Sequence, residues 1–472
     1  MSEQKNDQKT ENDMDKARYW LTEAPVFKAI AHMAIPMMLG MMAMAIYNFT
    51  DTLFVGMLGE TDALAALPLS LPVVSLMLAV SMFFEIGAGT FVSRAIGSSN
   101  AAAAKAGSSF AVAGSIIVGI ILAVFFLVFM DPILGLLGAS GGMAVFAQKY
   151  LSLYCMGAPF IVLNMVGAQL VRFIGRSKEA SFGIALSAIV NIALDPLLIF
   201  FFGLGIEGAA LATVLANALG VLFFVVLIAK SEVLSLRPQD IHLSRLQVVE
   251  IAKVGPSALF MGLLMGVASL VFNNVAVAYG AAMIAAFGIA QSVVQLLELV
   301  TMGLSEGVVP LMGGAWGAHD ACRMREVVKK TALCLVLYCA TACVLALAFA
   351  GPIVGWFSDD AAVLSVGPSI LAMQVLAVPF AAGSTLLMGL LQACGKGLAA
   401  NVLSWVKGLA FVPCVVVGSL LFAVPGVIAS LLVAEALAFL VALVLVKVSF
   451  PRRSAEEPAL GQLKCSAEQA EN

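Results

Sequence analysis

Long apolar runs, separated by short polar connections, make up almost the whole chain. Runs of about 20 residues recur from Ile30 to Val448, and a helix of about 20 residues crosses a hydrocarbon core about 30 Å thick. The pattern predicts twelve helices, at residues 30–55, 63–91, 108–130, 146–171, 179–203, 208–229, 254–279, 284–312, 331–350, 363–391, 399–423 and 426–448. We therefore expect an all-α integral membrane protein with twelve transmembrane helices.

The two halves of the chain repeat each other at a constant offset in residue number. The matched pairs are Pro36 and Pro256, Gly87 and Gly307, Gly97 and Gly317, Pro132 and Pro352, Gly135 and Gly355, and Pro159-Phe160 and Pro379-Phe380. Because six spans per repeat is an even number, both halves enter the membrane in the same orientation and should be related by an axis along the membrane normal. The sequence thus predicts two six-helix bundles around a cavity, an arrangement that suits alternating access.

Polar segments flank these two bundles. We expect a cytoplasmic N-terminal segment at residues 1–29, an N-lobe at 30–229, a cytoplasmic linker at 230–253, a C-lobe at 254–448 and a cytoplasmic tail at 449–472. The segment 1–20 is polar, so it lacks the apolar core of a signal peptide.

Positive charge is concentrated in alternate connections. Lys and Arg cluster after helices 2, 4, 6 and 8, in the two polar ends of the chain, and near the start of helix 11, where Lys396 and Lys407 lie. The remaining connections hold a single lysine, Lys149, together with six acids. Because positively charged loops stay in the cytoplasm, we expect both termini there and the protein in the plasma (inner) membrane.

Composition excludes several classes of function. Hydrophobic residues make up 62% of the chain and charged residues only 11%, whereas a soluble domain is about 25% charged. The sequence has no nucleotide-binding loop, and its three histidines (His32, His242 and His319) are scattered outside any HExxH or nucleophile motif. We expect no enzyme activity, no cofactor and no nucleic-acid partner, and an ion gradient or the membrane potential as the energy source.

Two acids lie inside these apolar runs. Asp51 is near the outer end of helix 1 and Asp195 is within helix 5. An ionisable group at membrane depth costs roughly 2.5–3.5 kcal/mol, which makes it a functional candidate. Asn191 lies one helical turn from Asp195, and Thr213 in helix 6 has a similar depth, about 7–18 Å from the outer face.

Four oxygen-bearing side chains suit a small hard cation such as Na⁺, or a proton. Equal depth does not by itself bring these side chains together. The alternatives are structural: helix capping for the two acids, and hydrogen bonds between helices for Asn191 and Thr213.

Several motifs carry a resemblance to a known family. They are Ile35-Pro36 with Tyr47-Asn48-Phe49-Thr50-Asp51-Thr52-Leu53-Phe54-Val55-Gly56, then Asn191-Ile192-Ala193-Leu194-Asp195-Pro196-Leu197-Leu198-Ile199-Phe200, Gly205-Ile206-Glu207-Gly208-Ala209-Ala210-Leu211-Ala212-Thr213, and Gln392-Ala393-Cys394-Gly395-Lys396. Residues 30–450 thereby resemble the MATE (multidrug and toxic compound extrusion) family.

The resemblance implies a V-shaped pair of bundles that exports organic, often cationic and lipophilic compounds in exchange for Na⁺ or H⁺. In the DinF-like and MepA-like branches, the cation site of the first lobe maps onto Asp51, Asn191, Asp195 and Thr213. Pro36 matches the helix 1 proline whose bend is proposed to respond to the cation. Branches with a second-lobe site carry acids on helices 7 and 10, and this chain has none there.

Cargo contacts are expected on helix 1 and in the C-lobe. Met37, Met41 and Met44 define one helical face, and methionine surfaces adapt to varied apolar ligands. We add Tyr47 and Glu298 as possible contacts, with ordinary packing of the methionines and an interhelical hydrogen bond of Glu298 as the alternatives. The expected partners are organic cations and the lipid bilayer, and the expected state is a monomer.

Three questions stay open in the sequence. The coupling ion is Na⁺ or H⁺: proton coupling requires an acid that exchanges its proton near neutral pH, whereas Na⁺ coupling allows both carboxylates to stay ionised. Glu85 and Glu306 are interpreted as structural acids beside basic residues. The alternative function is a flippase for lipid-linked precursors, whose anionic cargo would favour a cavity lined with Lys or Arg.

Overall fold

Helices account for every regular element in the computed structural model, which describes residues 13–277 and 280–450. The first half contains η1 (Tyr19–Glu23), α2 (Val26–Gly56), α3 (Thr61–Gly97), α4 (Ala101–Val128), α5 (Met130–Leu136), α6 (Gly141–Met156), α7 (Ala158–Phe173), α8 (Ser177–Pro196), η2 (Leu197–Phe201) and α9 (Ile206–Ala229). The second half contains η3 (Pro238–Asp240), α10 (Arg245–Val277), α11 (Ala281–Gly307), α12 (Val309–Gly317), α13 (Ala321–Ala348), α14 (Ala350–Phe357), α15 (Ala361–Ala393), α16 (Gly397–Leu409) and α17 (Phe411–Ser449).

The twelve predicted crossings can be counted from the helix lengths. Ten helical stretches are long and apolar enough to cross a membrane, and α6 with α7, bent by 53°, makes an eleventh. One of the ten, Gly397–Ser449, has 53 residues, or about 80 Å at 1.5 Å per residue, enough for two crossings. It reverses at Ala423, which has φ 49° and ψ −130°, and the backbones of Gly418 and Gly426 meet across this reversal. The described residues therefore form a multi-pass membrane protein.

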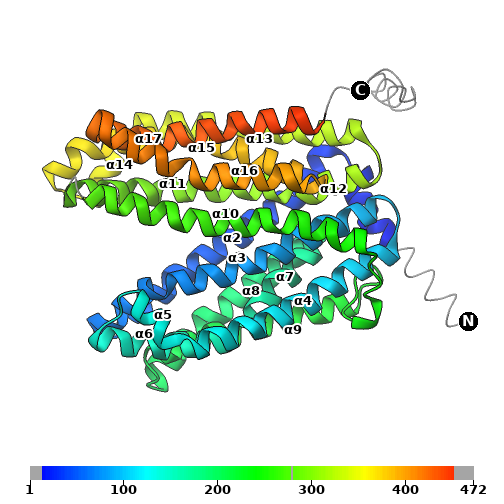
Figure 1. Cartoon of the computed structure of the whole chain (residues 1–472), viewed down its shortest axis with the longest axis horizontal. Coiled ribbons are helices and arrows are strands. Elements are labelled where there is room, and N and C mark those ends of the chain that lie inside the picture. Colours follow the sequence, from blue (N-terminus) through cyan, green and yellow to red (C-terminus); the bar gives the residue numbers. More distant parts are fainter. Residues whose placement is uncertain (1–12, 278–279, 451–472) are drawn as a thin grey trace, which may run out of the picture.

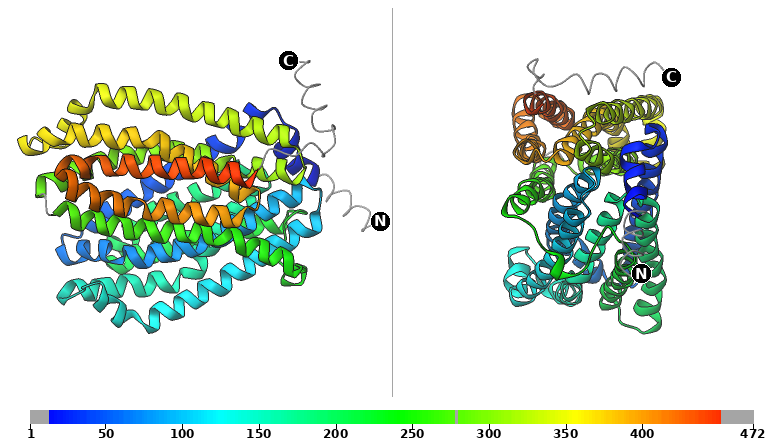
Figure 2. Two further views of the ribbon diagram at one scale, coloured as in Figure 1. Left: turned by 45° about the horizontal axis from the view of Figure 1, so that its top comes forward. Right: turned by 90° about the vertical axis from the view of Figure 1, so that its right-hand side faces the viewer.

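The helices form two lobes, α2–α9 and α10–α17, which we call the N-lobe and the C-lobe (Figure 1). The described chain begins and ends at the same end of the molecule, on the right in Figure 1. We call this the termini end. Seen from it, in the right-hand view of Figure 2, the two lobes lie one above the other with their helices nearly end-on.

Glycines hold the lobes together near the termini end. A Cβ atom on Gly97 of α3 would clash with the carbonyl oxygen of Gly314 in α12, and a Cβ on Gly317 would clash with the carbonyl oxygen of Arg94. These two contacts are related by the offset of the sequence repeat, which places the repeat axis between them. Only residues without a side chain allow two backbones to approach this closely.

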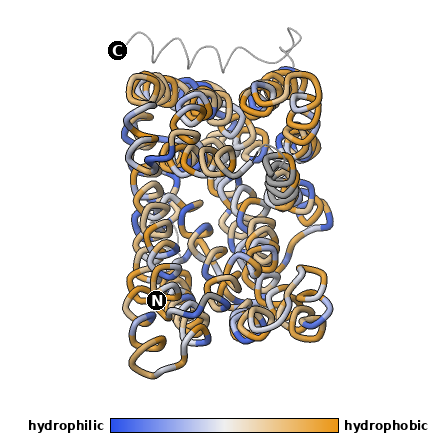
Figure 3. Tube along the Cα trace, turned by 90° about the vertical axis from the view of Figure 1, so that its left-hand side faces the viewer, coloured by the Kyte–Doolittle hydropathy of each residue, from blue (hydrophilic) through white to orange (hydrophobic). Residues whose placement is uncertain are grey.

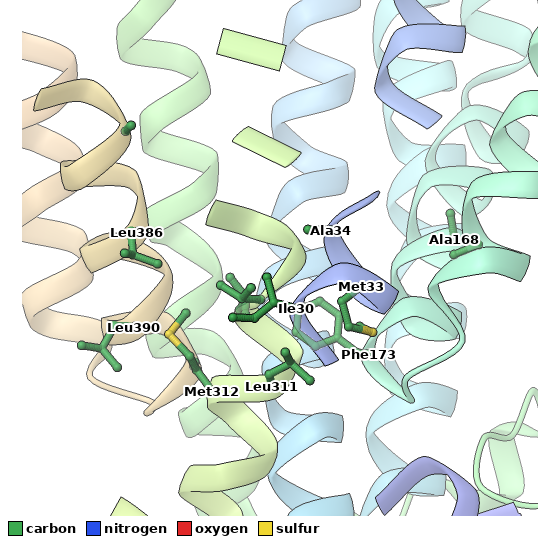
Figure 4. Close-up of a cluster of buried hydrophobic side chains, with 14 of the residues drawn as sticks. Ile30, Met33, Ala34, Ala168, Phe173, Leu311, Met312, Leu386 and Leu390 are labelled. Atoms are coloured by element: carbon green, nitrogen blue, oxygen red, sulfur yellow. The ribbon is translucent and has the colours of Figure 1, made fainter. Parts of the chain in front are cut away.

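A hydrophobic core crosses the same interface (Figure 4). Ile30, Met33 and Phe173 of the N-lobe belong to one buried cluster with Leu311 and Met312 of the C-lobe. Hydrophobic positions also dominate the outside of both lobes (Figure 3), where large side chains such as Leu136, Phe201 and Trp356 are exposed. Such exposed apolar surface is expected of a protein whose helices face lipid.

The structure differs from the expected helix bounds in several places, and the largest shift is that of α13, which begins at Ala321 rather than at residue 331. The fourth predicted helix is two, because Gly157 separates α6 from α7 and Pro159 occupies the first turn of α7. Helix α10 already begins at Arg245, inside the predicted linker. Part of the expected N-terminal segment packs onto the helices, because Leu21 is buried against α12. The ends of the predicted N-terminal segment and tail, residues 1–12 and 451–472, lie outside the described residues.

Candidate cation-binding site

Helix α8 supplies two of the four predicted site residues. Asn191 and Asp195 lie one turn apart near its end, and their side chains are 2% and 0% exposed. Pro196 follows and has no amide hydrogen, so it cannot bond to the carbonyl of Ile192, one turn before it. The α-helix gives way to the π-helix η2 directly after Pro196. Asp195 is therefore held at a point where the backbone hydrogen bonding of the helix is interrupted.

Thr213 of α9 joins these two residues. It is 6% exposed, and Asn191 Nδ2 lies 3.3 Å from its Oγ1. With the amide in the opposite orientation, Nδ2 donates to Asp195 Oδ2 at 3.3 Å, and Oδ1 accepts from Thr213 Oγ1 and N, each at 3.3 Å. This orientation satisfies both ends of the amide. Asn191 thus connects Asp195 to Thr213 across two helices.

Asp51 of α2 completes the group. It lies within electrostatic range of Asp195, and Oδ1 of each carboxylate is buried without a hydrogen-bond partner. Among the described residues, none of the charge interactions of either acid involves a Lys or Arg. Two such oxygens beside an amide and a hydroxyl have the chemistry that a small cation or protons would satisfy.

Two buried tyrosines of α6 also belong to this region, and the sequence analysis missed them. Tyr150 and Tyr154 are 7% and 6% exposed, and their rings stack with centroids 5.8 Å apart. Both hydroxyl groups lie within electrostatic range of Asp51, as does that of Tyr47. The sequence pattern that could have identified them is their spacing of four residues near the outer end of a span. Asn191 and Asp195 have the same spacing, which places two side chains on one face of a helix.

Polar contacts continue from the site into the N-lobe. Asn217 Nδ2 donates to the carbonyl of Thr213 at 2.8 Å, and Asn164 Nδ2 donates to Asn217 Oδ1 at 2.9 Å. A cavity of about 20 Å³ lies among these side chains and is also lined by Met44, Tyr47 and Asn191. A polar cavity of that size has room for about one water molecule.

The remaining candidates differ in their exposure and in the lobe that holds them. Met37 is 3% exposed, whereas Met41 and Met44 are half-buried. Pro36 lies inside α2, which continues through it. Glu298 is in the C-lobe, within electrostatic range of Glu435 and Lys407, away from the acids of the N-lobe.

The two acids interpreted as structural have a basic neighbour, as expected. Arg172 of α7 lies within electrostatic range of both Glu85 and Glu306. Ser81 Oγ also donates to Glu85 Oε1 at 2.6 Å. Glu306 belongs to the C-lobe helix α11 and Arg172 to the N-lobe, so this charge interaction crosses the lobe interface.

Comparisons with known proteins agree with this architecture. A family model described as MatE matches residues 36–197 and 256–417, two ranges that begin at the paired prolines of the sequence repeat. A Staphylococcus saprophyticus protein named multidrug export protein MepA is 33% identical over 447 residues, covering 94% of this chain and 99% of that protein. A Staphylococcus aureus protein of the same name is 34% identical over 433 residues, covering 92% and 96%.

Solved structures show the same fold. The structure described as MATE in the straight conformation superimposes with a TM-score of 0.85 at 22% identity, covering 96% of this chain and 99% of that chain. A multidrug resistance MATE family transporter in an outward-facing conformation gives a TM-score of 0.84 at 22% identity, covering 97% and 98%.

Proposed function

This chain belongs to the MatE family, and we propose that it is a secondary active multidrug exporter driven by inward movement of Na⁺ or H⁺. Its relatives that share about a third of their residues over nearly the whole length are named multidrug export proteins. The observation that carries the ion coupling is the acid pair, in which Asp51 and Asp195 each have a buried oxygen without a partner.

The acid pair works in this proposal as an exchangeable cation site. An ionised carboxylate in a membrane span is costly until a positive charge reaches it. A Na⁺ ion would take carboxylate oxygens together with the amide oxygen of Asn191 and the hydroxyl of Thr213. A proton would instead convert one buried acceptor oxygen into a donor. Either cation relieves the repulsion between the two carboxylates and changes how α2 packs against α8.

Cargo export follows if binding of the cation weakens binding of the cargo, and binding of the cargo weakens binding of the cation. Linkage is reciprocal: a cargo whose binding weakens cation binding is itself released when the cation binds. Pro36 leaves the carbonyl of His32 without its helical partner, so we assign the bending of α2 to this point. The half-buried Met41 and Met44 give the same helix an adaptable apolar surface for lipophilic organic cations.

The orientation follows from the positive loops. With Lys and Arg concentrated in the connections on the side of the termini, the termini end faces the cytoplasm. The glycine contacts and the shared core then hold the lobes together on the cytoplasmic side, in the plasma (inner) membrane. We propose that the monomer transports, because the cation site lies within one lobe.

A transport assay in liposomes tests the proposal. Purified protein is reconstituted and the efflux of a fluorescent organic cation is measured with a Na⁺ gradient alone, a pH gradient alone and neither. We expect one of the two gradients to drive efflux against the cargo gradient. Absence of organic-cation transport under both would contradict the proposal and favour the flippase for lipid-linked precursors.

A further inference from the structure

The C-lobe contains an acid pair of its own, but with a lysine beside it. Glu298 of α11 lies within electrostatic range of both Glu435 of α17 and Lys407 of α16. All three side chains are half-buried, and all three lie in stretches able to cross the membrane. An ionisable group at this depth needs a functional or electrostatic reason.

Lys407 is held in place by a third helix. Its Nζ donates to Thr385 Oγ1 at 2.7 Å and to the carbonyl of Ala381 at 3.4 Å, both on α15. An ammonium group has three hydrogens to donate, so these two bonds leave one for a carboxylate. Glu435 contributes a buried oxygen, Oε2, that has no hydrogen-bond partner.

Further charges face Lys407 from the lobe interface. Glu306 of α11 is within electrostatic range of Lys407, and also of Arg172 and Glu85 in the N-lobe. The acids that interact with the ammonium are therefore Glu298 and Glu306. Glu435 lies beside Glu298, and Arg172 offsets Glu306 from the opposite lobe. Lys407 is the positive charge on the C-lobe side of this network.

The sequence repeat identifies the N-lobe residue that corresponds to Lys407. The helices α16 and α17 correspond to α8 and α9 at the offset of the sequence repeat, and Lys407 falls at the position of Ser187. In the N-lobe the acid pair has neutral partners, Asn191 and Thr213, and its charge interactions include no Lys or Arg among the described residues. Among the described residues, the acid pair of the N-lobe therefore has no basic neighbour, whereas the acid pair of the C-lobe has Lys407.

We propose that Lys407 is a tethered cation that permanently offsets one of the two negative charges of Glu298 and Glu435, and so lowers by one the number of cations that the C-lobe takes from solution. The inference rests on the proposed ion-coupled export. An ammonium bound to the chain cannot dissociate when the lobes rock, so Glu298 and Glu435 together need one ion fewer from solution in either state. Lys407 is in this sense a positioning residue that sets how many ions move with each cargo.

Removing the lysine should let the C-lobe acids bind one more cation. We would first remove the N-lobe site with Asp51→Asn and Asp195→Asn, and then measure the thermal unfolding midpoint of the purified protein across Na⁺ concentration and pH. The dependence of the midpoint on cation in this background is the reference. Adding Lys407→Gln should make the midpoint rise more steeply with cation than in this background, whereas Lys407→Arg, which keeps the charge, should leave the dependence unchanged. Lys149→Gln is the matched control, because that lysine is half-exposed on α6 beside Glu207.

A second readout counts ions in the protein with an intact N-lobe. Lys407→Gln should raise the number of cations moved per cargo molecule by about one, because one fixed positive charge has been removed. Should Lys407→Gln fail to fold, Lys407→Gln combined with Glu435→Gln restores the net charge that the wild-type group has and should restore folding. Failure of that double variant to fold would contradict the inference.

The same measurements distinguish this inference from the proposed function. A wild-type protein without organic-cation export contradicts the export proposal, whatever the midpoints show. Coupled export by the wild type, together with a Lys407→Gln midpoint and ion count equal to those of Lys407→Arg, would overturn the tethered cation alone.

Discussion

In the N-lobe, the acids of α2 and α8 lie beside an amide and a hydroxyl, whereas in the C-lobe the acids of α11 and α17 lie beside a lysine. The two lobes are repeats of each other, and the glycine contacts at their interface keep the symmetry of the repeat. The backbone has thus retained the duplication while the charges have diverged. The difference indicates that the same fold can hold acids without a basic neighbour in one lobe and acids with a lysine in the other.

The largest effect on export is expected when the acids of the N-lobe are neutralised. Asp51→Asn with Asp195→Asn removes both charges that require a cation, so gradient-driven export should fall to the rate of protein-free liposomes. Efflux under an imposed Na⁺ or pH gradient is the measurement. Glu207→Gln, at a half-exposed acid near the start of α9, is the control and should export normally. Export by the double variant at the wild-type rate would refute the assignment of the site.

A lysine in the N-lobe should make the two lobes alike. Asp51→Lys places an ammonium beside Asp195, as Lys407 does beside Glu298, and a tethered charge removes the need for an ion. We expect export to lose its response to Na⁺ and pH gradients while the unfolding midpoint becomes independent of both. Asp359→Lys, at an exposed loop position, controls for the change of net charge. A variant that remains cation-dependent would show that Asp195 does not need a positive partner.

A smaller change should weaken the N-lobe site without abolishing it. Thr213→Val keeps the shape of the side chain but removes the hydroxyl that contacts Asn191. A net hydrogen bond contributes about 0.5–1.5 kcal/mol, so the apparent cation affinity should fall by up to about tenfold. The cation concentration for half-maximal export measures it. Thr52→Val is the matched control, because Thr52 is exposed and bonds only within α2; an equal effect there would remove the case for Thr213.

The smallest effect is expected on the cargo surface of α2. Met41→Leu with Met44→Leu conserves volume and apolar character, a kind of change that usually costs less than about 1.5 kcal/mol. Cargo affinity should therefore change by less than about tenfold, with an unchanged cation requirement. Cargo titration of export rates checks this, and Met156→Leu, at an exposed position of α6, is the control. A changed cation requirement would place these methionines in the ion site instead.

Much of the architecture was predictable because hydrophobicity and repeat spacing are local properties of the sequence. The runs that gave the twelve spans follow from the thickness of the bilayer, and the depth of Asn191 and Thr213 on neighbouring helices placed them at one level. The structure adds that Asn191 contacts both Thr213 and Asp195. Lateral distances between helices could not be obtained in this way, so the convergence of these groups was left open.

The missed groups show the limit of pattern analysis. Tyr150 and Tyr154 look like packing residues in an apolar run, and only the packing of α6 against α3 and α9 brings them near Asp51. Glu435 was overlooked for the same reason. The sequence places Lys407 among the positive residues near the start of helix 11, but it lies in the last turn of α16, which begins at Gly397, about 15 Å along the helix from that residue. Its partners come from α11, α15 and α17, which one sequence cannot bring together.

The central claim is that the acid pair of the N-lobe binds a cation that the cargo displaces. Adding an organic cation to purified protein in weakly buffered solution, while proton release and Na⁺ binding are recorded, tests it most directly because linkage is reciprocal. The account predicts that cargo releases H⁺ or bound Na⁺ from the wild-type protein and releases neither from Asp51→Asn with Asp195→Asn. Equal release from both proteins would contradict it.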